Sequence, residues 1–290
     1  MKIALKPNLT RVHAAETTRE IAYWLRKYEA EFAVTPEIYP ELSDIEGLGK
    51  IEEHDLLTWC DVVIAVGGDG SMLMAAKATV PYDKPILCIN AGHLAFMAGL
   101  ERNELERLKD LIDGNYKIDR RMLLTVRIKR DGETLLHTHC INDVVLARGK
   151  QLKLIDYNID CDGRRINTYR ADGVIVATPT GSSAYSLSAG GPVIDPGIEA
   201  IVVTPICAQS LFARSIVFNS NNTLQVYCDE EASNLDLVLS VDGGESIPIE
   251  KTDMITIDKA TKYADFIRIK NDSFFDILNT KLAGLEAPKE

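Results

Sequence analysis

A short glycine-rich turn with a single carboxylate is the first candidate for chemistry. The apolar run Asp61–Val66 ends in the turn Gly67–Ser71, in which Asp69 is the only charged residue, and a helical pattern follows. Glycines permit positive φ and a close backbone approach to phosphate oxygens, and a helix N-terminus adds partial positive charge. The turn therefore predicts a phosphate site at the carboxyl end of a buried strand, where open α/β sheets bind ligands. An ordinary strand-to-helix turn capped by Asp69 fits equally well.

A longer segment of glycine and small hydroxyl residues is more specific. It extends from Arg170 to Pro192 and includes Thr-Pro-Thr-Gly-Ser-Ser-Ala-Tyr-Ser-Leu-Ser over residues 178–188. Proline and glycine predict a rigid turn, Ser182 or Ser183 can cap a short helix, and exposed amides and hydroxyls can surround a polar ligand. A serine-rich surface loop fits less well, because the interleaved Ala and Gly favour close packing.

An adjacent polar pair, Asn142-Asp143, lies inside a predicted strand. Such a pair destabilises a fold unless it is hydrogen-bonded, so it indicates either a ligand's ribose or base or satisfaction by neighbouring backbone. His137 and His139 share one strand face while Cys140 points to the other, so these residues are interpreted as structural and not as a metal site.

Composition narrows the class of protein. The 290 residues are 46% hydrophobic and 26% charged, which is typical of a globular protein with a sizeable core. A formal net charge of −11 argues against a nucleic-acid partner, which needs a concentrated positive surface. The first residues are too polar for a signal peptide and no apolar run is long enough to span a membrane, so we expect a cytoplasmic protein without a membrane partner.

The periodicity predicts two domains. Strand-like and helical runs alternate up to about residue 112, which predicts an α/β domain with a mainly parallel sheet. After Arg120, alternating runs flank Asp131-Gly132 and Asp162-Gly163, a strong hairpin signal, and predict an all-β, sandwich-like domain. Helical spacing near the end predicts a C-terminal helix that packs back on the first domain. We therefore expect domains at 1–118, completed by 273–290, and at 119–272.

Taken together, the motifs resemble the NAD kinase family, in particular its bacterial branch. The resemblance covers most of the chain in order, and the long stretch from Thr178 to Pro192 is its strongest part. A Gly-Gly-Asp-Gly turn alone is weak evidence, because lipid kinases and phosphofructokinases carry similar loops. The matching elements are Gly67-Gly68-Asp69-Gly70, Asn90-Ala-Gly-His-Leu, Asn142-Asp143, Ala171-Asp172-Gly173, Thr178–Pro192, Thr204–Cys207, Ser210-Leu211 with Arg214, and Val241-Asp242-Gly243.

The resemblance implies a function and roles for residues. It implies transfer of a phosphoryl group from ATP or polyphosphate to the 2′-hydroxyl on the adenosine side of NAD, with Mg²⁺, in a homodimer or homotetramer. Asp69 would be the acid-base residue, and Gly67, Gly68 and Gly70 would shape the phosphate loop. The implied NAD-binding residues are Asn142, Asp143, Arg170, Asp172, Ser183, Ala184, Tyr185, Ser186, Leu187, Ser188 and Asp242.

Some positions depart from the family pattern. The usual pair is Asn-Glu, so Asp143 has a shorter reach, and Ala95 and Ser183 replace the usual Gly and Thr. After Asp242, two glycines offer no side chain to a ligand. The sequence names no metal ligands, and Mg²⁺ commonly binds through substrate phosphates and waters.

Two other classes of function share these features. A lipid kinase could carry the same glycine loop, but the chain has no basic amphipathic segment for an anionic membrane. A non-catalytic nucleotide sensor could use the same site, but sensing does not require a carboxylate aimed at a hydroxyl. An assay for NADP formation from NAD separates these classes.

Overall fold

The computed structural model describes residues 1–92, 95–150, 153–210, 212–228, 236–271, 274–276 and 278–279. The chain forms two compact units. Unit 1 comprises Met1–Arg120 and Ala264–Glu290, and unit 2 comprises Arg121–Tyr263.

The core of unit 1 is a parallel sheet with the strand order β5-β4-β1-β2-β3. A short strand, β6, adds to β5 in parallel. Strand β4 is buried along its whole length, as expected of a strand covered on both faces. The bounds are β1 Lys2–Pro7, β2 Glu31–Val34, β3 Gly49–Lys50, β4 Val62–Gly67, β5 Ile86–Asn90 and β6 Leu100–Glu101.

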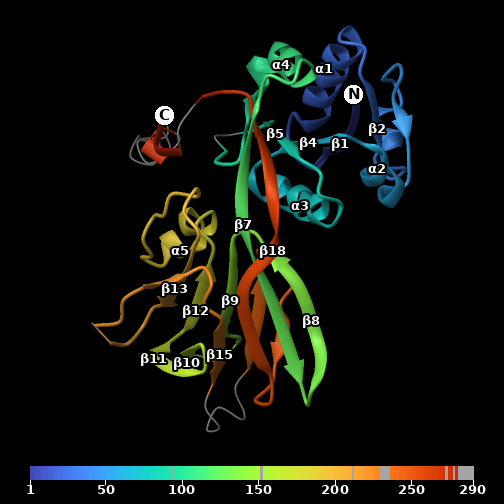
Figure 1. Ribbon diagram of the computed structural model, residues 1–290. Helices are drawn as coiled ribbons and strands as arrows, with labels where there is room; N and C mark the ends of the chain where they lie inside the picture. Colours follow the sequence, from blue (N-terminus) through green and yellow to red (C-terminus); the bar gives the residue numbers. More distant parts are fainter. Residues whose placement is uncertain are drawn as a thin grey trace. The chain divides into compact units, whose positions relative to one another are not determined.

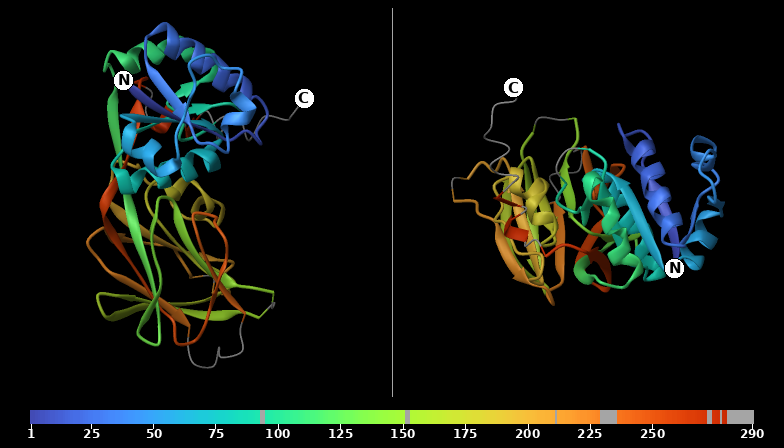
Figure 2. Two further views of the ribbon diagram at one scale, coloured as in Figure 1. Left: turned by 90° about the vertical axis from the view of Figure 1, so that its right-hand side faces the viewer. Right: turned by 90° about the horizontal axis from the view of Figure 1, so that it is seen from above.

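Helices cover both faces of this sheet, with α1 and α4 on one face and α2 and α3 on the other (Figures 1 and 2). In α1, residues Ile21, Ala22 and Leu25 recur at helical spacing and are buried against the sheet. The bounds are α1 Ala14–Lys27, α2 Glu53–Trp59, α3 Asp69–Thr79 and α4 Leu108–Ile112, with 3₁₀ turns at η1 Tyr39–Leu42, η2 Val80–Tyr82 and η3 Arg102–Arg107.

The chain returns to unit 1 along strand β18, Met254–Arg268. Two strand-like runs, Met254–Asp258 and Phe266–Lys270, predict separate strands here, and the predicted β-rich domain extends to residue 272. Instead, Phe266 pairs in parallel with Ile86, and Ile267 and Ile269 join the apolar core of unit 1. The middle of β18 is polar and contains two alanines, so the sequence pattern there does not indicate one continuous strand.

The predicted C-terminal helix is present over residues 274–276 and 278–279, and Leu278 is buried. The rest of the predicted segment 273–290 lies outside the described residues.

Unit 2 is a sandwich of two antiparallel sheets, which confirms the predicted fold class. One sheet has the order β11-β10-β15-β18 and continues through β7 to β8, and the other has the order β14-β13-β12-β9-β16-β17. Apolar residues from both sheets form one core. The strands of the two sheets are coloured green to orange in Figure 2. The bounds are β7 Lys117–Arg130, β8 Glu133–Cys140, β9 Asp143–Arg148, β10 Ile155–Cys161, β11 Arg164–Ala171, β12 Gly173–Ala177, β13 Ala200–Ile206, β14 Ile216–Asn219, β15 Leu224–Cys228, β16 Leu237–Val241 and β17 Ile247–Ile249.

Both predicted Asp-Gly hairpins are present. Asp131-Gly132 joins β7 to β8 and Asp162-Gly163 joins β10 to β11, and all four residues have positive φ. The predicted position of the Asn142-Asp143 pair was wrong in one respect. The expected strand breaks after Cys140, so Asn142 lies in a turn and Asp143 is the first residue of β9.

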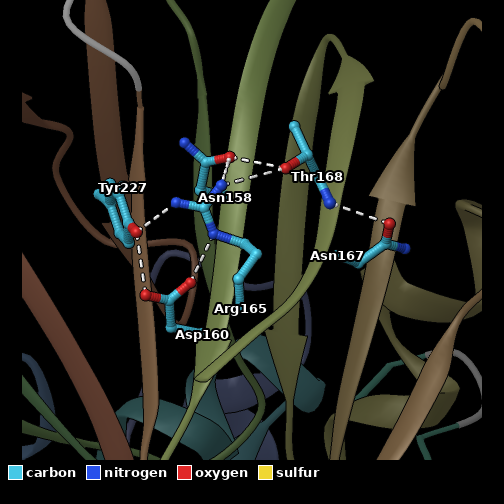
Figure 3. Close-up of polar contacts among 6 residues, drawn as sticks. All are labelled: Asn158, Asp160, Arg165, Asn167, Thr168 and Tyr227. Carbon is cyan, nitrogen blue, oxygen red and sulfur yellow. Dashed lines mark hydrogen bonds and ion pairs between the residues drawn. The ribbon is translucent and has the colours of Figure 1, made fainter. Parts of the chain in front are cut away.

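A polar cluster lies on the side of β10, β11 and β15 away from the core (Figure 3). Arg165 donates from Nε to Asp160 Oδ1 (2.6 Å) and from Nη1 to Asn158 Oδ1 (2.8 Å), and it also contacts Tyr227. The Tyr227 hydroxyl donates to Asp160 Oδ2 (2.9 Å), and Thr168 donates to Asn158 Oδ1 (2.7 Å). Because the polar groups of this cluster hydrogen-bond to one another, we interpret the cluster as a structural link between the three strands.

Candidate active site

The glycine turn of unit 1 has the shape that the sequence predicted for a phosphate loop. Gly67 ends β4 with a φ of 157°, and a Cβ at this position would lie 2.8 Å from Cβ of Ser71. Gly68 is the N-cap of α3, and its carbonyl accepts the amides of Ser71 (2.9 Å) and Met72 (3.0 Å). Backbone atoms of Gly67 and Gly68 therefore form the entry to the first turn of α3, next to the side chain of Ser71.

Asp69 is the first residue of α3 and is half-buried. Its Oδ1 accepts the backbone N–H of Met97 at 3.0 Å, from the segment between β5 and β6. This bond fixes one carboxylate oxygen from outside the helix. Because Gly68 occupies the N-cap position, Asp69 lies in the first turn of α3. A carboxylate at this place can act as a hydrogen-bond acceptor for a hydroxyl group.

Two asparagines lie at the ends of the strands on either side of β4, and one of them contacts the glycine turn. Asn8, directly after β1, donates from Nδ2 to Ser71 Oγ at 2.8 Å. Asn90, at the end of β5, donates to Glu101 Oε2 (2.8 Å) and accepts the amide of Gly92 (3.0 Å). Sequence reasoning missed Asn8, although a polar residue directly after a buried parallel strand is a recognisable signal.

The turn between β8 and β9 in unit 2 is built around Asp242. The carboxylate of Asp242 accepts the amide of Ile141 at 3.1 Å and that of Asn142 at 2.7 Å. In return, the Asp242 amide donates to the carbonyl of Asp143 at 2.9 Å. Asp242 has a φ of 54° and is buried, so its side chain holds the Asn142 backbone from the end of β16.

The start of the predicted small-residue segment holds the same turn from the other side. The Thr178 amide donates to the Asn142 carbonyl (2.9 Å) and its hydroxyl donates to the Ile141 carbonyl (2.5 Å). Gly181 packs so closely that a Cβ there would lie 2.7 Å from Cα of Asn142 and overlap its carbonyl. The backbone of Asn142 is therefore fixed on both sides.

Asp143 is a buried titratable group of this site, next to the buried Asp242. Burial, and then the charge of neighbouring Asp242, raise the pKa of its carboxyl to about 6. A carboxylate in this environment is poorly solvated when it is ionised. Hydrogen-bond donors of a bound ligand would therefore stabilise its ionised form.

The rest of the segment divides into packed and accessible side chains. Ser182 donates to the Pro179 carbonyl (2.6 Å), and the buried Ser186 hydroxyl contacts Thr204 Oγ1 (2.9 Å). The predicted helix caps, Ser182 and Ser183, cap no helix; the chain forms a 3₁₀ turn, η4, at Gly181–Ser183 and a short helix, α5, at Tyr185–Ser188. The predicted residues with exposed or half-buried side chains are Ser183, Ala184, Tyr185, Leu187 and Ser188.

Arg170 and Asp172 are not brought to the Asn142 turn. Strands β9 and β12 are antiparallel, with Asp143 opposite Ala177 at one end and Ala147 opposite Gly173 at the other. Asp172 lies at the far end, where Arg148 donates to its Oδ1 at 2.8 Å. At about 3.3 Å per residue, the length of β12 separates the two positions by roughly 15 Å within this unit.

Among the described residues, no group of three or more His, Cys, Asp or Glu side chains could hold a metal ion. Mg²⁺ commonly retains waters and binds through substrate phosphates with one or two carboxylates. Asp69, beside the glycine turn, is the carboxylate that fits this second arrangement.

Comparisons with known proteins agree with both halves of this description. The N-terminal domain of ATP-NAD kinases matches residues 3–116, and their C-terminal domain matches residues 141–269. The chain belongs to the NAD kinase family. An NAD kinase from Thermoanaerobacter sp. (strain X514) is 35% identical over 282 residues, which cover 97% of this chain and 98% of the relative.

Solved structures of family members have the same fold. Yeast NADH kinase in complex with NADH superposes with a TM-score of 0.88 at 26% identity, covering 100% of this chain and 89% of that one. An NAD kinase from Archaeoglobus fulgidus in complex with ATP gives a TM-score of 0.73 at 25% identity, covering 98% and 99%. The predicted NAD kinase activity is confirmed at the level of the family, and a lipid kinase or a sensing module finds no support. In the described part of the chain, no helix is both long and apolar enough to cross a membrane.

Proposed function

We propose that this NAD kinase family member transfers the terminal phosphoryl group of ATP to the 2′-hydroxyl of the adenosine ribose of NAD, with Asp69 as the proton acceptor. The observation that carries the proposal is the position of Asp69, which is half-buried within the glycine turn and oriented by the Met97 amide. The A. fulgidus relative bound to ATP and the yeast relative bound to NADH support the two substrate classes.

The chemistry of a ribose hydroxyl decides when its proton moves. A ribose hydroxyl is a weak acid and an aspartate is a weak base, so deprotonation before attack is uphill. In a loose phosphoryl-transfer transition state, the nucleophile needs orientation more than activation. Asp69 therefore accepts a hydrogen bond from the hydroxyl and takes its proton as the new O–P bond forms.

The glycine turn acts on the donor phosphates. Gly67 lets the chain pass close to Ser71, Gly68 and Gly70 leave the backbone open to phosphate oxygens, and the N-terminus of α3 favours negative charge. A Mg²⁺ ion bound with the nucleotide would supply charge neutralisation at the phosphate oxygens.

The unit 2 residues bind the dinucleotide in this proposal. Asn142 and Asp143 hydrogen-bond the adenosine portion, while the accessible part of Ser183–Ser188 lines the site. Asp242 acts through the backbone of Asn142. Arg170 and Asp172 stay predicted NAD-binding residues, and the division into a phosphate-loop domain (1–118 with 273–290) and an NAD-binding domain (119–272) stays a prediction, as do the cytoplasmic location and the homodimer or homotetramer.

The decisive experiment incubates purified protein with Mg²⁺, a phosphoryl donor and either NAD or NADH. We expect NADP or NADPH to form with ATP, and EDTA to abolish the reaction. Polyphosphate in place of ATP tests the second donor. Phosphorylation of a lipid or sugar without any NADP or NADPH would contradict the proposal.

A further inference from the structure

The segment that orients Asp69 is itself held by a distant arginine. Between β5 and β6, the Met97 amide donates to Asp69 Oδ1 at 3.0 Å. The carbonyls of Met97 and Ala98 accept hydrogen bonds from Nη1 of Arg268, at 3.3 and 2.7 Å. Arg268 is the last residue of β18, so the returning strand reaches the segment that contacts Asp69.

The guanidinium of Arg268 is fixed as well as charged. Its Nε donates to Asp119 Oδ2 at 3.1 Å, and its side chain is only 18% exposed. The planar guanidinium presents donors in a fixed fork, so anchoring one edge on Asp119 orients the other edge toward the two carbonyls. Bonds from a cation are stronger than bonds between neutral groups.

The backbone beside these carbonyls is also confined. The Gly99 amide donates to the Cys88 carbonyl at 2.8 Å, and a Cβ at Gly99 would lie 2.8 Å from the Ile267 carbonyl. Burial raises the pKa of the Cys88 thiol to about 12, with Arg268 lowering it and Asp69 raising it. Both charges therefore act on the same buried side chain.

We propose that Arg268 is a positioning residue for phosphoryl transfer: by clamping the Met97 and Ala98 carbonyls, it holds the Met97 amide where it orients the Asp69 carboxylate. The inference rests on the proposed role of Asp69. Without the clamp, the amide can move away and the carboxylate samples other rotamers, and a misplacement of about 1 Å can reduce a rate about 100-fold.

The matched variants are Arg268→Ala, Arg268→Lys and Arg120→Ala. Arg120 is one residue from Asp119 and forms a comparable ion pair with Asp265 (2.8 Å), so it controls for loss of an arginine between β7 and β18. We expect Arg268→Ala to lower kcat about 10- to 100-fold with KM for NAD and ATP changed less than threefold. Arg268→Lys should recover part of the loss, since an ammonium can donate to the two carbonyls but has no rigid planar group that also bonds Asp119. Arg120→Ala should keep near-normal kcat.

Two further measurements connect the effect to Asp69. Hydrogen exchange of the Met97 amide should become at least about tenfold faster in both Arg268→Ala and Asp69→Ala, which lacks the acceptor oxygen, and not in Arg120→Ala. Combining Arg268→Ala with Asp69→Asn should lower kcat no further than Asp69→Asn alone, because the two act through one interaction.

The outcomes separate this inference from the proposed function. A folded Arg268→Ala protein with normal kcat and normal Met97 exchange would overturn the inference while leaving the kinase activity intact. Full additivity with Asp69→Asn would overturn it as well. If Asp69→Asn is itself fully active, the proposed role of Asp69 fails, and Met97 exchange still reports whether the clamp exists. Should Arg268→Ala not fold, Arg268→Lys gives the same comparison in a milder variant.

Discussion

The two functional regions of this chain, the glycine turn of unit 1 and the Asn142 turn of unit 2, obtain their shapes in opposite ways. The glycine turn depends on missing side chains: Gly67 has a φ of 157°, and a Cβ at Gly68 would meet nothing within 4 Å. The Asn142 turn depends on groups that fill space, namely Asp242, Thr178 and the tightly packed Gly181. An open backbone allows phosphate oxygens of a ligand to come close to the main-chain amides. A tightly packed network instead holds the backbone of Asn142 in one conformation.

The largest expected effect is a loss of catalytic rate in a variant that leaves the conformation of both turns unchanged. Asp69→Asn keeps the size of the side chain but removes the proton acceptor, so kcat should fall about 100- to 10,000-fold while NAD affinity changes little. Steady-state kinetics and titration calorimetry measure the two quantities. Asp55→Asn, an exposed carboxylate in the first turn of α2, is the matched control. A near-normal kcat for Asp69→Asn would remove this residue from the mechanism.

The second prediction compares glycines in the two regions. Gly181→Ala should destabilise the fold by about 1 to 3 kcal/mol, because its Cβ would overlap the Asn142 backbone. Gly68→Ala should change the free energy of unfolding by less than about 0.5 kcal/mol, because its Cβ enters open space. Urea denaturation measures both. Equal stability of the two variants would mean that the regions do not differ in the way described; loss of activity in a stable Gly68→Ala protein would indicate that the alanine blocks a ligand.

The third prediction concerns the role of Asp143. If its carboxylate accepts hydrogen bonds from NAD, Asp143→Ala should weaken NAD binding by about 10- to 100-fold, since such a bond contributes about 1.5 to 3 kcal/mol. Asp143→Glu, which restores the family's usual residue, should be tolerated if the site leaves room for one methylene. Calorimetry on folded protein decides the matter. Unchanged affinity in Asp143→Ala would show that backbone, and not NAD, satisfies the pair.

The smallest effect is a pH dependence confined to unit 2. With a pKa of about 6, Asp143 is mostly ionised at pH 7 and mostly protonated at pH 5, so NAD affinity should fall about tenfold over this range. Asp143→Asn should bind more weakly and show no such step.

Unfolding of the protein does not explain the expected loss of NAD affinity between pH 7 and pH 5. A raised carboxyl pKa contributes stability that is fully present below the ordinary value of 3.8 and is lost as pH rises to about 6. Asp143 by itself therefore favours the folded state at pH 5 over pH 7. A flat affinity profile in the native protein would show that NAD does not depend on the ionised carboxylate.

Local sequence determined much of this protein. Asp-Gly pairs determined two hairpins, since both residues must adopt positive φ there. An apolar run followed by glycines located the end of β4 and Asp69, because strand period and glycine freedom act over a few residues. The small-residue segment located the neighbourhood of Thr178–Ser188, and the resemblance of its motifs to NAD kinases identified the family.

Tertiary structure alone decided which groups meet. Asp242 bonds to the amide of Asn142 from 100 positions along the chain, and Arg268 bonds to the carbonyl of Met97 from 171. The antiparallel pairing of β9 with β12 placed Asp172 away from Asp143, although both belong to one predicted set. These contacts depend on sheet register and on the path of the returning strand, which follow from burial of both cores and leave no signal in the residues nearby.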